Sequence, residues 1–211
     1  MPAVGYPWVP HWHMNSPIEF WFEFASNYSY PAAMRIERLA REHSRRVIWR
    51  PFLLGPIFRD QGWTDAPANL FPAKGRYMWR DSERVCAQLG LPFRKPSQFP
   101  RNGLNAARIA TAYSEAEWLP QFVKRVFTAE YGDDLDIASE GVLRACLTGV
   151  APDPDAALAA MRDESVKAQL RRSNERAVEL GIFGAPTFIV GDELFWGNDR
   201  LETALGWSAT K

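Results

Sequence analysis

Cysteine and histidine are scarce in this sequence. The two cysteines, Cys86 and Cys146, lie far apart, and there are only three histidines. No pair of them has the C-x-x-C or H-x-x-x-H spacing of a metal site, and no G-x-S-x-G motif of a serine hydrolase occurs. Each cysteine falls within a helical pattern, which favours two buried free thiols over a disulfide. The sequence therefore predicts no metal site and no catalytic cysteine.

Excess charge and long apolar runs are also missing. Lys plus Arg and Asp plus Glu number 25 each, so no net field attracts nucleic acid or an anionic membrane. No apolar run approaches the roughly 20 residues that cross a bilayer, and no Lys or Arg precedes Arg35. We therefore expect a cytoplasmic protein that binds neither nucleic acid nor membrane. Residues 1–15 mix proline with aromatic residues and show no period, which predicts a flexible leader.

Aromatic residues, by contrast, are concentrated near the amino end. Apolar side chains alternate along IEFWFEFA, residues 18–25, as in a buried strand. The turn Ser26-Asn27-Tyr28-Ser29 follows, and then a predicted helix over about 31–42. Short polar side chains cap the free N–H groups at a helix start, and those groups together with the helix dipole stabilise an anion. The stretch thus predicts a strand, turn and helix with a potential anion site at the turn.

This layout is that of a thioredoxin-type active site, in which a cysteine opens the turn before the helix. Here Ser26 and Ser29 stand where the sulfurs would be, so the protein itself cannot carry out dithiol redox chemistry. The anion-stabilising geometry remains and suits a thiolate supplied by another molecule. The alternative is that both serines are only helix caps.

The remaining elements complete an α/β pattern. A second strand is predicted at VIWRPFLL, residues 47–54, where Pro51 indicates an edge or a strand end, and a Gly/Pro-rich loop follows at 55–74. Helical patterns then occupy about 75–180, before strands at 187–190 and 193–196 joined by Gly191-Asp192 and a last helix at about 199–205. We expect a thioredoxin-like fold with a large all-helical insertion between the β-α-β start and the β-β-α end. Residues 16–74 and 181–211 would form the thioredoxin-like domain, and 75–180 the inserted helical subdomain.

Several motifs together resemble one known family. Gly184-Ala185-Pro186-Thr187-Phe188 lies where thioredoxin-like folds carry a cis-proline that faces the active-site turn. With FASNYSY (24–30), PAKGRYMWRD (72–81) and GIFGAPTFIVGDELFWGNDRLE (181–202), the chain resembles the 2-hydroxychromene-2-carboxylate isomerases, relatives of kappa-class glutathione transferases and DsbA-type oxidoreductases. The resemblance covers about residues 17–207.

The resemblance implies a set of site residues. Ser26 would activate glutathione, the backbone of Ala185 would pair with its cysteinyl group, and Lys74 would lie near its glycine carboxylate or the substrate. The remaining implied glutathione contacts are Trp196, Gly197, Asn198, Asp199 and Asp65, and the implied substrate contacts are Asn69, Tyr77 and Phe99. Tyr77 and Phe99 also suit plain packing.

Two positions depart from the family pattern. Asn27 stands where the family turn often has proline. In the 55–74 segment, where relatives use an asparagine to bind ligand, Asp65 and Asn69 are both candidates and the sequence does not choose between them.

The resemblance implies a glutathione-dependent cis-trans isomerase that interconverts 2-hydroxychromene-2-carboxylate and trans-o-hydroxybenzylidenepyruvate, or a similar small aromatic pyruvate. Glutathione would act as a regenerated cofactor, and the protein would be a homodimer. Two alternatives stay open: a kappa-like glutathione transferase that releases a conjugate, and a redox-inert thioredoxin-like binding module.

Overall fold

The computed structural model describes residues 16–207, so the predicted leader 1–15 lies outside the described part of the chain. Its sheet has the order β2-β1-β3-β4. β1 (Ile18–Phe22) pairs in parallel with β2 (Val47–Pro51) and antiparallel with β3 (Thr187–Val190), which pairs antiparallel with β4 (Glu193–Trp196). The predicted thioredoxin-like sheet, built from both ends of the chain, is confirmed.

β1 lies between β2 and β3 and packs against apolar side chains on both faces of the sheet. Phe20 and Phe22 face a large core that includes Phe188, Phe127 and residues of the helices α1 (Ser29–Glu42) and α10 (Leu201–Gly206). Trp21 points the other way, into a smaller cluster with Phe52 at the end of β2. Aromatic side chains of this size each bury a large apolar area, so both faces fix the position of the turn that follows β1.

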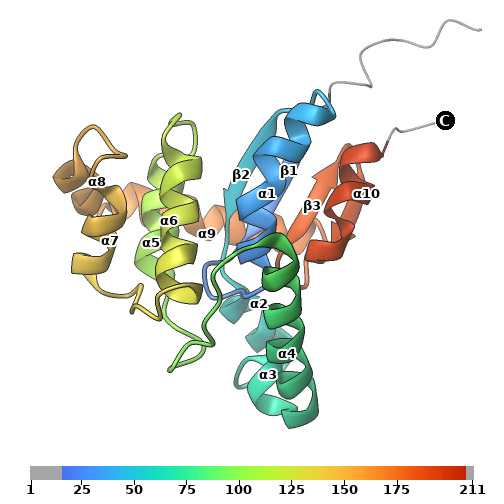
Figure 1. Cartoon of the computed structure of the whole chain (residues 1–211). Coiled ribbons are helices and arrows are strands. Elements are labelled where there is room, and N and C mark those ends of the chain that lie inside the picture. The colour runs from blue at the N-terminus through green and yellow to red at the C-terminus, as the bar shows by residue number, and fades with distance from the viewer. Residues whose placement is uncertain (1–15, 208–211) are drawn as a thin grey trace, which may run out of the picture.

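Helices surround this sheet on several sides. Figure 1 shows α5 to α8 gathered beyond β2, α10 beside β3, and α4 with α3 extending away from the sheet. The helices are α1 (Ser29–Glu42), α2 (Leu54–Asp60), α3 (Pro67–Leu70), α4 (Pro72–Leu89), α5 (Leu104–Ala112), α6 (Leu119–Tyr131), α7 (Glu140–Leu147), α8 (Pro154–Ala160), α9 (Glu164–Glu179) and α10 (Leu201–Gly206), with the 3-10 helix η2 (Asn198–Arg200) before α10.

The prediction of a loop at 55–74 is wrong. The structure has α2 and α3 there, and α4 already begins at Pro72. Pro67 and Pro72 each occupy the start of a helix, where the missing N–H costs nothing. Helical structure between β2 and β3 therefore begins at Leu54, not at Gly75.

Other local predictions are confirmed. Pro51 is the last residue of β2, which is an edge strand, and Gly191-Asp192 joins β3 to β4 as a hairpin. Cys86 and Cys146 are buried free thiols, and burial raises the pKa of both to about 11. Among residues 16–207, no helix is long and apolar enough to cross a membrane.

Candidate functional site

The turn between β1 and α1 brings the two serines together around one hydroxyl. The Ser26 Oγ accepts the Ser29 N–H at 3.2 Å and donates to the Ala185 carbonyl at 2.9 Å. The Ser29 N–H also contacts the Ser26 carbonyl oxygen at 3.0 Å. Ser26 therefore caps the start of α1 and links it to the segment before β3, 159 positions away along the chain.

The segment before β3 carries the predicted cis-proline. The Ala185–Pro186 peptide bond is cis, and the Pro186 carbonyl accepts the Gly197 N–H at 2.9 Å. Gly184 lies directly under the Trp196 indole, with no room for a Cβ, and that indole also packs against Phe183. Ser26, Ala185 and the last residue of β4 therefore lie at the same end of the strands.

The residues after β4 form a closely held corner. Gly197 has φ of 110°, and a Cβ there would lie 2.6 Å from Asp199 Oδ1, so glycine is required. The Asn198 carbonyl and Oδ1 both accept from Arg35 Nη2 of α1, at 2.7 and 3.1 Å. Asp199 is exposed and is 3.4 Å from Arg200. Of the predicted γ-glutamyl contacts, Asn198 is thus engaged by the protein itself, whereas the Asp199 carboxylate faces solvent.

The start of α1 has features suited to an anion. No acidic residue lies in its first turn, so no charge of α1 itself offsets the positive end of the helix dipole. The Ser29 Oγ is fully buried and has no hydrogen-bond partner among residues 16–207. An unpaired buried hydroxyl is costly, but only the Ser29 N–H, not its hydroxyl, contacts Ser26. The Ser26 hydroxyl and the start of α1 are the groups that suit a thiolate held against the turn.

Glu23 is a carboxyl close to the turn that the sequence pattern did not single out, because it alternates with aromatics like an ordinary outward strand residue. Burial raises the pKa of Glu23 to about 7, partly offset by a hydrogen bond from the Leu54 N–H. The Glu23 carbonyl accepts the Ser26 N–H at 3.0 Å. A carboxyl that titrates near neutrality therefore stands three residues before Ser26.

The other predicted site residues lie on α3, α4 and the adjoining chain. Asn69 Nδ2 is 3.2 and 3.1 Å from the two oxygens of Asp65, and 3.3 Å from the Phe99 carbonyl. Asp65 and Asn69, left as alternatives by the sequence, thus bind each other. Lys74 lies 4.6 Å from the centre of the Phe71 ring, and Tyr77 is 63% exposed. We call these four residues, Asp65, Asn69, Lys74 and Tyr77, the α3–α4 rim.

Phe99 packs edge-on against Trp79 of α4, with ring centres 4.7 Å apart, and Trp79 in turn lies under Lys95. Phe99 is therefore part of an aromatic wall attached to the rim.

Tyr28 links the turn to α4, the helix that carries two of the rim residues. Its hydroxyl donates to Asp81 Oδ2 of α4 at 2.9 Å. Burial raises the pKa of Tyr28, and so do the bond to Asp81 and the neighbouring charges of Asp81, Tyr77 and Asp199. The residues beside Tyr28 thus come from α4 and from the corner after β4.

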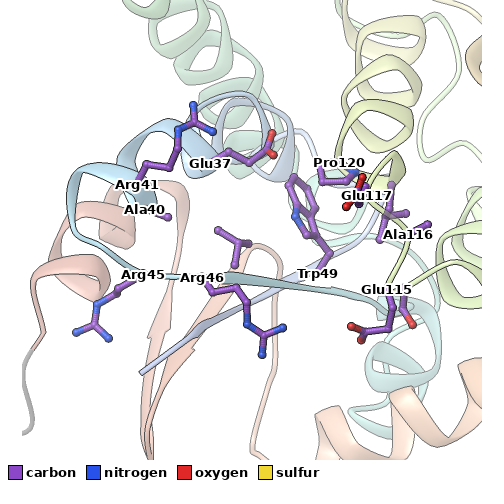
Figure 2. A pocket seen from close by; sticks show the side chains of 13 residues that line it. Glu37, Ala40, Arg41, Arg45, Arg46, Trp49, Glu115, Ala116, Glu117 and Pro120 are labelled. Atoms are coloured by element: carbon purple, nitrogen blue, oxygen red, sulfur yellow. The ribbon is translucent and has the colours of Figure 1, made fainter. Parts of the chain in front are cut away.

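Two hollows in the structure lie elsewhere, along the edge strand β2. One, of about 270 Å³, lies between α1, β2 and the segment before α6, with Trp49 and several charged side chains around it (Figure 2). The other, of about 310 Å³, lies between β2 and α9. None of the predicted site residues lines either one. Among residues 16–207, no group of three or more His, Cys, Asp or Glu side chains is placed to hold a metal ion.

The fold and this constellation define a DsbA-like thioredoxin domain, and the model of that family matches residues 17–206. The 2-hydroxychromene-2-carboxylate isomerase of Sphingobium xenophagum is 31% identical over 90% of this chain and 96% of its own length. A solved 2-hydroxychromene-2-carboxylate isomerase superposes with a TM-score of 0.79, at 26% identity, over 90% of this chain and 94% of the other. Within the DsbA-like group, the chain belongs to the family of these isomerases.

The similarity extends to a second kind of enzyme. Glutathione S-transferase kappa 1 of Homo sapiens is 26% identical over 88% of this chain and 87% of its own length. The sequence motifs predicted similarity both to the isomerases and to the kappa-class glutathione transferases, and both are found.

Proposed function

We propose that this protein is a glutathione-dependent cis-trans isomerase of 2-hydroxychromene-2-carboxylate or a similar small aromatic pyruvate. The observation that carries the proposal is the Ser26 hydroxyl, held between the α1 start and the carbonyl before a cis-proline. Full-length similarity to isomerases of this substrate supports the reaction type.

The residues that would hold glutathione come from both ends of the chain. Its thiol would lie at Ser26 and the α1 N–H groups, its cysteinyl backbone along Ala185, and its γ-glutamyl end at residues 196–199. When bound, glutathione supplies a thiolate whose reversible addition to a conjugated alkene allows rotation about the former double bond. Ser26 must turn its proton away from the Ala185 carbonyl to donate to a thiolate.

The substrate would lie on the side of the α3–α4 rim. Phe99 and Tyr77 offer aromatic surface, Asn69 an amide, and Lys74 a positive charge for a carboxylate. Asp65 would act through its bond to Asn69, which it holds in position.

Product analysis tests the proposal. Purified protein is given 2-hydroxychromene-2-carboxylate with and without glutathione, and the isomer ratio and the glutathione concentration are followed together. We expect faster equilibration only with glutathione, and no glutathione consumed. Equal rates without glutathione would contradict the proposal.

A kappa-like glutathione transferase is the second candidate, favoured by the similarity to the human kappa enzyme. It would use the same thiol site but consume glutathione and release a thioether. If calorimetry detects no binding at millimolar glutathione, the redox-inert binding module is the better reading.

We also propose that the protein is a homodimer, as the family resemblance implies, and that it works in the cytoplasm. Sedimentation of the purified full chain tests the assembly.

A further inference from the structure

The two middle residues of the active-site turn are bonded to two consecutive residues of α4. Asn27 Nδ2 donates to Ser82 Oγ at 2.6 Å, and the next residue, Tyr28, donates through its hydroxyl to Asp81. We call these four residues, Asn27, Tyr28, Asp81 and Ser82, the turn–α4 clasp.

The Asn27 arm of the clasp is closed to solvent. Asn27 is 4% exposed and Ser82 is 2% exposed, so water cannot replace the bond between them. Loss of Ser82 would leave the Asn27 amide as a buried donor without this partner, which is more costly than loss of an exposed hydrogen bond. Loss of Asn27 leaves Ser82 its bond to the Met78 carbonyl. The bond therefore fixes the turn against α4 in one arrangement.

The clasp continues into the part of α4 that carries the rim. Ser82 Oγ also donates to the Met78 carbonyl at 2.9 Å, one helical turn earlier. Met78 stands between Tyr77, a rim residue, and Trp79, which supports Phe99. A chain of two hydrogen bonds thus leads from the residue after Ser26 to the aromatic wall.

Ser26 directly precedes Asn27, and its hydroxyl must satisfy two partners on different elements. The distances from Ser26 Oγ to the Ser29 N–H and the Ala185 carbonyl depend on the backbone at 27 and 28. We propose that Asn27 and Ser82 are positioning residues: they hold the turn against α4, so that Ser26 is aligned with the thiol and the α4 wall is set relative to Ser26. The role in the reaction rests on the proposed function.

The test compares Asn27→Ala, Ser82→Ala and the double variant with the wild type. The main readout is the pH at which bound glutathione is half ionised, followed by thiolate absorbance in the ultraviolet. We expect this midpoint to rise by about one pH unit in each single variant, and kcat/KM to fall about tenfold, the scale of one lost buried hydrogen bond. The double variant should resemble the single variants, because both remove the same bond.

Two further variants separate positioning from general damage. Ser82→Thr keeps the hydroxyl and should lie within about twofold of the wild type in kcat/KM. Ser173→Ala removes a comparable bond, from a helix serine to the Pro51 carbonyl, and should leave the thiolate midpoint unchanged. An unchanged midpoint in Asn27→Ala and Ser82→Ala, or effects that multiply in the double variant, would overturn the proposal.

Hydrogen exchange distinguishes this inference from the proposed function. The amides of residues 26–30 should exchange faster in Asn27→Ala and Ser82→Ala than in the wild type or Ser173→Ala. If the exchange rates of these amides are unchanged in both variants, the clasp does not hold the turn, even if the enzyme is active. A wild-type protein that binds no glutathione overturns the proposed function, and with it the role of the clasp in that reaction.

Discussion

The two sides of the proposed site are built differently. On the turn side, Ser26, Ser29 and Ala185 are held together by hydrogen bonds of the Ser26 hydroxyl and by backbone bonds within the turn. On the α3–α4 rim, the side chains are largely exposed and contact mainly one another, as Asn69 does with Asp65. The comparison teaches that the turn side is preformed by the fold, whereas the exposed side chains of the rim are free to rearrange.

The largest effect is expected from removal of the preformed hydroxyl. Ser26→Ala should lower glutathione-dependent kcat/KM by about a hundredfold or more, as for loss of one preorganised donor at a developing charge. Steady-state kinetics at saturating glutathione measure the effect, with Ser173→Ala as a serine control in α9. If Ser26→Ala retains full turnover, the turn side is not the catalytic side and the comparison fails.

The pH dependence of the free energy of unfolding tests whether the Glu130 carboxyl is buried away from water. Glu130 of α6 is fully buried, and neither carboxylate oxygen has a partner among residues 16–207. Burial raises the pKa of Glu130 to about 8; nearby Arg101 lowers it, and Asp136, Glu23 and Asp134 raise it. Between about pH 4.5 and 8, the folded state therefore holds a proton that the unfolded state has lost.

With more protons bound in the folded state, the free energy of unfolding must fall as pH rises through this window, by up to about 1.4 kcal/mol per pH unit from Glu130. Glu130→Gln carries no such proton, so its unfolding free energy should fall less with pH. Urea unfolding from pH 5 to 9 measures both slopes, and exposed Glu115→Gln is the matched control. If the unfolding free energy of the wild type and of Glu130→Gln changes equally with pH, water reaches the Glu130 carboxyl and its pKa is not raised by burial.

A smaller effect is expected at the corner after β4. Gly197→Ala would place a Cβ against Asp199 at a backbone conformation that other residues rarely adopt, and so displace the N–H that binds Pro186. We expect glutathione affinity to fall about tenfold by calorimetry. Gly191→Ala in the β3–β4 turn also has positive φ but meets nothing within 4 Å, and it should cost stability without changing affinity. Equal losses of affinity in both variants would remove the specific role of the corner.

The same contrast explains which features the sequence predicted. Pro51, the Gly191-Asp192 hairpin and the x-Pro before β3 restrict the backbone by themselves, so their neighbours could be placed from sequence alone. The Ser26 turn was likewise fixed by its spacing between an aromatic strand and a helix.

Features that depend on tertiary contacts were missed. α2 and α3 have few buried residues, only Leu54 and Ile57 in α2 and none in α3, so no apolar period marks them as helices. Glu130 follows a helical pattern, and nothing local shows that its carboxyl is buried. The Asn27 to Ser82 bond joins residues 55 positions apart and leaves no sequence signal.

The smallest effect should come from the rim. Lys74→Ala removes an exposed charge with no ion pair among residues 16–207, so its attraction for an anionic substrate is screened by solvent. We expect KM for the aromatic pyruvate to rise by less than about threefold, with kcat unchanged, and the difference to vanish at high salt. Arg76→Ala on the same helix removes an equal exposed charge and serves as the control. A salt-independent loss of tenfold or more for Lys74→Ala alone would mean that the rim is as preorganised as the turn, because only a desolvated, fixed contact escapes screening.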